Sequence, residues 1–217
     1  MPRYRTRSWR AFDPAAASAV AVPTATVARP APVVRLTQLA NVRILGLDPG
    51  SRRTGFGVIE CGGAKSTQLA HGCIVVAGNT LSERLRYIFE NVHTLIERYQ
   101  PNEVAIERVF VNRNVDSALK LGHARGAALC AVPTTMPVFE YAPRAIKLAV
   151  VGFGAAEKVQ VAHMIRMLLA VGGRISADAS DALAVAVCHA HSRRMHAITA
   201  SSEMTVAIGA RPRSRAR

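Results

Sequence analysis

The sixteen residues 45–60, LGLDPGSRRTGFGVIE, constrain the fold of this chain most. An apolar run typical of a buried strand ends at Asp48, a turn with two glycines follows, and a second apolar run begins at Phe56. Burying an unpaired carboxylate is costly unless a cation, a metal ion or several hydrogen bonds compensate it. Asp48 is therefore expected to have a positively charged partner, and the identity of that partner bears directly on function.

The rest of the core alternates short apolar strands with amphipathic helices. Strands are predicted at five places and helices at four, with the long helix stopped by Pro101: strands 42–48, 56–60, 68–76, 103–107 and 137–141; helices 80–100, 116–132, 155–170 and 176–192. The first three strands follow one another closely, as in an antiparallel meander, and later strands alternate with helices. The order predicts an α/β fold with one mixed five-stranded sheet flanked by helices.

The two ends of the chain differ in composition from the core. Residues 1–41 and 192–217 each hold six arginines and one acid, so only +4 of the net charge of +14 falls between them. Residues 1–41 are poor in large apolar side chains, which predicts a disordered extension, a misannotated start ahead of Val42, or a transit peptide. Residues 42–192 are the expected folded domain, and residues 193–217 a basic, disordered tail.

The cysteines and the hydropathy indicate a compartment. The four cysteines form no C-x-x-C pair, which favours reduced thiols in the cytoplasm over a disulfide framework. No apolar run reaches the roughly 18–20 residues that a membrane helix needs. We therefore expect a soluble cytoplasmic protein, and the positive charge favours a nucleic-acid partner.

Three further acids resemble Asp48 in their setting. Glu107 ends the fourth strand, and Asp178 and Asp181 open an otherwise apolar helix with the i, i+3 spacing that puts both carboxylates on one face. Each has an ordinary alternative, namely helix capping for Asp178, the helix dipole for Asp181 and an ion pair with Arg108 for Glu107. Together, four converging carboxylates would require cations. Oxygen ligands of this kind suit Mg²⁺ or Mn²⁺, and two such ions can support phosphodiester cleavage.

Five segments of the core also resemble the RuvC family of Holliday-junction resolvases: RILGLDPGSRRTGFGVIE, AIERVFVNRNVDSALKLGHARGAAL, PVFEYAPRAIKLAVVG, AEKVQVAHMI and DASDALAVAVCHAH. The resemblance covers about 42–191. It implies a ribonuclease-H-like fold, a homodimer, and two Mg²⁺ ions per active site, with Mn²⁺ as a substitute. It further implies symmetric nicks across four-way junction DNA in recombination and repair, 5′-phosphate ends, and association with the RuvA and RuvB branch-migration proteins.

The resemblance also assigns roles to individual residues. The catalytic, metal-binding acids fall on Asp48, Glu107, Asp178 and Asp181. Two lysines match positions that support catalysis and contact DNA, Lys147 and Lys158. Phe110 matches a phenylalanine that contacts the opened bases of the junction, with ordinary packing as its alternative. Four arginines are further candidates for phosphate contacts: Arg52, Arg53, Arg113 and Arg125. Cys188, His189 and His191 lie on one helix and are not expected to converge on a metal.

Other functions stay open at this point. A ribonuclease-H-like nuclease acting on an RNA–DNA hybrid would need a similar set of acids. An actin-fold ATPase or sugar kinase shares the D-x-G-x₄-G turn, although 217 residues hardly hold its two lobes. A noncatalytic DNA-binding relative would not need all four acids. Cleavage of a junction, a linear duplex and a hybrid under the same conditions separates these possibilities.

Overall fold

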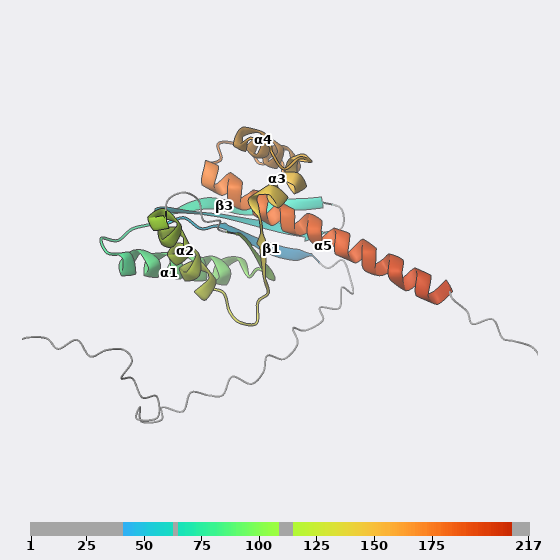
Figure 1. Ribbon diagram of the computed structural model, residues 1–217, viewed down its shortest axis with the longest axis horizontal. Helices are drawn as coiled ribbons and strands as arrows, with labels where there is room; N and C mark the ends of the chain where they lie inside the picture. Colours follow the sequence, from blue (N-terminus) through green and yellow to red (C-terminus); the bar gives the residue numbers. More distant parts are fainter. Residues whose placement is uncertain (1–40, 63–64, 109–114, 210–217) are drawn as a thin grey trace, which may run out of the picture. The chain divides into compact units, whose positions relative to one another are not determined.

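A computed structural model describes residues 41–62, 65–108 and 115–209, with side chains up to 195. Phe110 and Arg113 lie outside the described residues, as do nearly all of the N-terminal extension and residues 210–217. The elements follow one another along the chain (Figure 1): β1 (Val42–Asp48), β2 (Arg53–Gly62), β3 (Lys65–Val75), α1 (Leu81–Tyr99), β4 (Glu103–Glu107), α2 (Val115–Cys130), β5 (Val138–Tyr141), α3 (Pro143–Val151), α4 (Lys158–Leu168) and α5 (Ala177–Gly209).

The five strands form one sheet in the order β3-β2-β1-β4-β5. β1, β2 and β3 pair antiparallel, whereas β1 pairs parallel with β4, and β4 pairs parallel with β5. The predicted meander and the mixed five-stranded sheet are confirmed. β1 lies at the centre of the sheet, which explains its continuous apolar run from Ile44 to Leu47.

Helices cover both faces of the sheet (Figure 1). α1 and α2 lie on one face, and α5, with α3 and α4 packed against it, lies on the other. Because side chains alternate between the faces of a strand, β1 contributes Leu45 and Leu47 to the core under α1 and α2, and Ile44 to the core under α5. Asp48 follows Ile44 by four residues and therefore belongs to the α5 face.

α5 approaches the sheet closely because glycines and alanines meet at the contact. A Cβ atom on Gly46 would overlap the carbonyl oxygen of Ala182, and one on Gly55 would overlap that of Asp178. Along the same face of β2, a Cβ on Gly57 would lie 2.6 Å from a methyl carbon of Leu183. The glycines of the opening motif are thus the surface on which the first turns of α5 rest.

Two sequence predictions about helices were wrong. No helix was predicted between 141 and 155, but α3 occupies Pro143–Val151, with Pro143 in the first turn, where a missing N–H costs nothing, and Ile146 and Val150 buried four residues apart. The last helix was predicted to end at 192, but α5 continues to Gly209. Residues 193–208 contain no proline or glycine that would stop it.

The long helix α1 begins as its sequence predicts. The hydroxyl of Thr80 accepts a hydrogen bond from the Glu83 amide, and the Glu83 carboxylate accepts one from the Thr80 amide, each at 3.2 Å. This is the predicted capping box. In the described part of the chain, no helix has the length and apolarity that crossing a bilayer demands.

Candidate active site

The pairing of β1 with β4 places Asp48 beside Glu107. The two strands run parallel with Gly46 opposite Ala105 and Leu47 opposite Ile106, so Asp48 and Glu107 come next at the same edge of the sheet. Both belong to the α5 face and both are partly buried. After Asp48 the chain turns sharply, and the hydroxyl of the buried Thr54 closes the turn by donating to the Gly50 carbonyl at 3.1 Å.

The start of α5 carries the other two acids to the same edge. Ser176 caps this helix, because its hydroxyl accepts from the Ala179 amide at 3.3 Å and its carbonyl accepts from the Ser180 amide at 3.0 Å. The alternative that Asp178 serves as the cap is therefore wrong. Asp178 and Asp181 both lie in the first turns of α5, and their charges raise the pKa of Asp48.

The electrostatics show how close these carboxylates are. Burial and the neighbouring Asp181 raise the pKa of Asp48 to about 6. Burial, followed by the charges of Asp48 and Asp181, raises the pKa of Glu107 to about 7. Lys158 works against both shifts, and Lys147 against that of Glu107. The site thus gathers more negative charge than its lysines neutralise, as functional sites often do.

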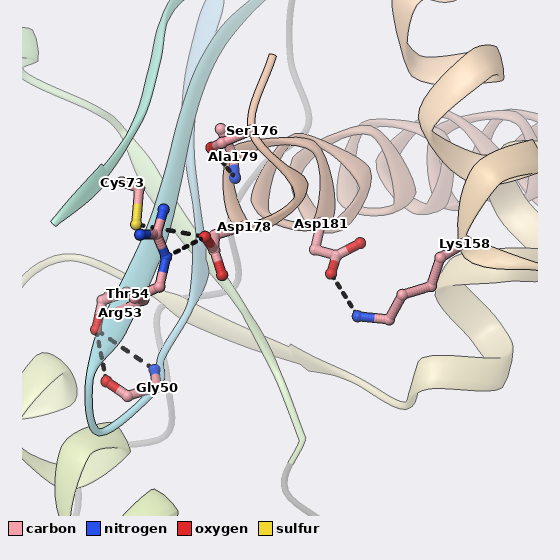
Figure 2. Close-up of polar contacts among 9 residues, drawn as sticks. All are labelled: Gly50, Arg53, Thr54, Cys73, Lys158, Ser176, Asp178, Ala179 and Asp181. Atoms are coloured by element: carbon pink, nitrogen blue, oxygen red, sulfur yellow. Dashed lines mark hydrogen bonds and ion pairs between the residues drawn. The ribbon is translucent and has the colours of Figure 1, made fainter. Parts of the chain in front are cut away.

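Lys158 is the direct partner of Asp181. Its ammonium donates to the Asp181 carboxylate at 2.8 Å from the first residue of α4 (Figure 2). The Lys158 side chain is 79% exposed, so the ammonium remains open to a ligand approaching from solvent. Lys147, on α3, is close enough to lower the pKa of Glu107. The structure therefore brings both predicted lysines to the acids.

Asp178 has a partner that sequence reasoning did not find. The Arg53 guanidinium donates to its carboxylate at 2.7 Å, and the Cys73 thiol donates to the same oxygen at 3.5 Å (Figure 2). Burial works to raise the pKa of Asp178, but these hydrogen bonds outweigh it and hold that pKa below its ordinary value. Gly55 pairs with Cys73 across β2 and β3, and only this register brings the thiol to the site.

Other arginines have structural partners. Arg125 was a candidate phosphate contact, but it donates to the Glu107 carbonyl at 3.2 Å and forms an ion pair with Glu140 at 2.8 Å, with a side chain only 17% exposed. Arg108 faces Glu140 at 3.6 Å, so the alternative that it neutralises Glu107 is wrong. No such contact occupies the side chain of Arg52 among the described residues, and it is exposed.

Cys188, His189 and His191 do not converge on one point, as predicted. His189 is buried and lies between Glu103, at 2.6 Å from Nε2, and the Tyr141 hydroxyl, at 2.7 Å from Nδ1. His191 instead donates to the Ala149 carbonyl at 3.0 Å. Arg193 also forms an ion pair with Glu103, at 2.8 Å, so Glu103 contacts both His189 and Arg193. This network satisfies polar groups in the core on the side of α5.

The four carboxylates suit a divalent metal ion, but the two on α5 form ion pairs with basic side chains of the protein. In residues 41–62, 65–108 and 115–195, no three Asp, Glu, His or Cys side chains are grouped closely enough to hold a metal ion as they stand. The reason is that Asp178 faces Arg53 and Asp181 faces Lys158 (Figure 2). Carboxylate oxygens from β1, β4 and α5, with unneutralised charge at Asp48 and Glu107, are the chemistry that Mg²⁺ or Mn²⁺ requires. Each of these ion pairs uses only the Oδ2 atom of its carboxylate, so each acid keeps a second oxygen with which it could bind a cation.

The raised pKa values predict how stability depends on pH. A carboxyl whose pKa is higher in the folded state stabilises the fold below its unfolded pKa, and this contribution is lost as the pH rises through about 6–7. In EDTA at pH 8, Asp48→Asn should therefore have a melting temperature about 2–8 °C above that of the unsubstituted protein. This shift corresponds to a gain of roughly 1–2 kcal/mol in the free energy of unfolding, after solvent screening is allowed for. The difference should vanish near pH 4.

Melting curves of both proteins between pH 4 and 8 check this expectation. Asp116→Asn, which removes an exposed acid from α2, is the control and should show no gain at pH 8. A lower melting temperature for Asp48→Asn at pH 8 would contradict the repulsion among the acids.

This chain is similar in sequence and structure to known proteins of one family. A family model described as crossover junction endodeoxyribonuclease RuvC matches residues 44–189. RuvC of Methylococcus capsulatus is 52% identical over 153 residues, covering 70% of this chain and 92% of that protein. RuvC of Shewanella sediminis is 50% identical over 173 residues, covering 79% and 95%. T. thermophilus RuvC, solved in complex with a Holliday junction substrate, is 34% identical with a TM-score of 0.67, covering 71% of this chain and 96% of that one.

Proposed function

The chain belongs to the RuvC family of crossover junction endodeoxyribonucleases, and we propose that Asp48, Glu107, Asp178 and Asp181 are the residues with which it cuts DNA. Its mixed sheet and flanking helices are those of the ribonuclease-H-like fold. The observation that carries the proposal is the placement of Asp48 and Glu107 on adjacent strands, with the acids of α5 close enough to raise the pKa of Asp48.

The proposed cofactor is Mg²⁺, with two ions per site and Mn²⁺ as a substitute. The four carboxylates would hold them: Asp48, Glu107, Asp178 and Asp181. Such ions would lower the pKa of an attacking water and stabilise charge on the leaving oxygen. The protein's contribution is a rigid frame, since Asp48 and Glu107 end paired strands and the backbone of Asp178 lies against Gly55.

The lysines are proposed to act on the phosphate. Released from Asp181, the ammonium of Lys158 can bind a phosphate oxygen beside the acids, because its side chain already extends into solvent there. Lys147 lies on the Glu107 side of the site and supplies a second positive charge. Both would balance the negative charge that a DNA phosphate brings toward four carboxylates.

The DNA contacts and partners complete the proposal. The substrate is four-way junction DNA, which the homologous T. thermophilus RuvC holds in its complex. Phe110 is proposed to stack on opened bases and Arg113 to bind a phosphate. A homodimer would place two sites for symmetric nicks, and association with RuvA and RuvB is part of the same proposal. We also propose a cytoplasmic location, a nuclease domain at 42–192, and nonspecific nucleic-acid contact by the basic residues after 192.

Cleavage of three substrates under one set of conditions tests the function. With Mg²⁺, a mobile four-way junction should be nicked at least about a hundredfold faster than a linear duplex of the same sequence or an RNA–DNA hybrid. The reason is that a junction presents two symmetric strands to a dimer and opened bases at its centre. Equal or faster cleavage of the hybrid would overturn the junction assignment in favour of a ribonuclease-H-like activity.

A further inference from the structure

A pocket lies against the middle of α5, at Val187, His191 and Arg194, away from the acids at the start of that helix. It has a volume of about 360 Å³, within the range of small-molecule sites. Its wall is formed by the start of β3, the last residue of α4 with the two residues that follow it, and one side of α5. Arg194 follows Asp181 by thirteen residues, or about 20 Å along a helix. The pocket is therefore separate from the candidate active site.

The charges on this wall are uncompensated. Lys65 and Arg194 are its charged residues, and no carboxylate lines it. Elsewhere arginines pair with acids, as Arg43 does with Glu60 and Arg193 with Glu103. Neither Lys65 nor Arg194 forms such a pair in the described part of the chain. Two unpaired cations beside one cavity attract an anion.

Arg194 also has a hydrogen-bonding group without a partner. Its Nη2 atom is shielded from solvent and makes no hydrogen bond to the residues that the structure describes. An unsatisfied buried donor is costly, and an ordered water or ion is an ordinary explanation for it. A guanidinium matches the oxygens of a phosphate particularly well, because two of its N–H groups can donate in parallel.

The rest of the wall supplies further donors on a fixed backbone. Ser66 contributes a hydroxyl group, which lies 3.5 Å from the Cys61 thiol, and His191 is held in place by its bond to the Ala149 carbonyl. Ala170 adopts a left-handed backbone conformation, with φ of 49°, just after the C-cap of α4, and the Val171 amide donates to the Arg166 carbonyl at 3.1 Å, so a regular helix ending fixes this wall. Leu168, Leu169 and Val187 add an apolar surface beside these polar groups.

We propose that this pocket binds a phosphate group through Lys65, Arg194 and the hydroxyl of Ser66. The phosphate can belong to the backbone of a DNA arm or to a free phosphorylated molecule such as a nucleotide. In both cases it is bound about 20 Å from the site of cleavage. The proposal rests on the pocket and not on the assignment of the catalytic acids.

Two binding measurements on the full chain in EDTA test the proposal and separate the two sources. The pocket variant is Lys65→Ala/Arg194→Ala, and the control, Arg86→Ala/Arg98→Ala, removes the same charge from exposed positions on α1. Calorimetry with inorganic phosphate and with thymidine 5′-monophosphate measures free ligands. Junction binding between 50 and 200 mM salt measures backbone phosphate.

For a free phosphorylated ligand, the pocket variant should lose phosphate or nucleotide binding at least about tenfold, with junction binding unchanged. For a DNA phosphate, its junction affinity should fall about tenfold, and the slope of log K against log salt should become shallower by about 0.9 per lost contact. Lys65→Glu, a change at an exposed position, should reproduce either effect if the double variant folds poorly. If the pocket variants match the control in both measurements, the phosphate site is wrong.

Discussion

Replacing Glu107 by Gln, or Asp48 by Asn, is expected to reduce nicking of a four-way junction by on the order of a thousandfold or more. The amide keeps the size of each side chain but loses the charge with which a divalent cation is held. Junction affinity measured in EDTA should stay within about threefold, because the acids repel DNA and removing one carboxylate does not weaken phosphate contacts. The nicking rate in Mg²⁺ and the dissociation constant in EDTA are the two measurements.

A matched acid on another surface controls for charge. Glu90→Gln removes an exposed carboxylate from α1, on the opposite face of the sheet, and should nick at the parental rate. The melting temperature of each variant shows that the fold is intact, and Asp48→Asn should even gain stability at pH 8. Nicking by Glu107→Gln within tenfold of the parent would remove Glu107 from the catalytic set and with it the proposed two-ion site.

The second large effect is expected from a single methyl group at Gly46. In Gly46→Ala the new Cβ would overlap the Ala182 carbonyl oxygen and lie 2.9 Å from the Ala186 Cβ, so α5 must move away from the sheet. Overpacking of this kind costs roughly 1–3 kcal/mol. A displacement of about 1 Å at the α5 acids should lower nicking about a hundredfold. Thermal melting and the nicking rate with saturating junction measure the two consequences.

Gly122→Ala is the control for this change. Gly122 lies exposed on α2, and a Cβ there would meet nothing within 4 Å. Exchanging a helical glycine for alanine should raise stability by roughly 0.5–1 kcal/mol and leave nicking unchanged. If Gly46→Ala were as stable and as active as Gly122→Ala, the close packing of α5 on β1 would not be what positions the acids.

Most of the fold could be predicted from local sequence patterns. Apolar runs ending in turn residues located every strand, and the spacing of Thr80 and Glu83 located the start of α1. The failures occurred where local signals are weak. No helix was predicted directly after Tyr141, where Pro143 opens α3, and α5 has no residue before Gly209 that would end it.

Local sequence was sufficient to identify which residues of the site have unusual settings. An acid at the end of a buried strand needs compensation wherever it lies, so Asp48 and Glu107 could be selected without knowing their neighbours. The spacing of Asp178 and Asp181 likewise follows from helix geometry alone. These are local properties, because the apolar run or helix turn that distinguishes each acid lies directly beside it in the sequence.

Which of these groups contact one another depends on the tertiary fold. The parallel register of β1 and β4 brings Asp48 beside Glu107, and the glycine surface of β1 and β2 lets α5 bring its acids to them. The pairing of Asp178 with Arg53 joins residues 125 positions apart. A one-residue change in register would turn each side chain to the opposite face of the sheet. Register and packing depend on the whole core at once, and for this reason no local stretch of sequence contains them.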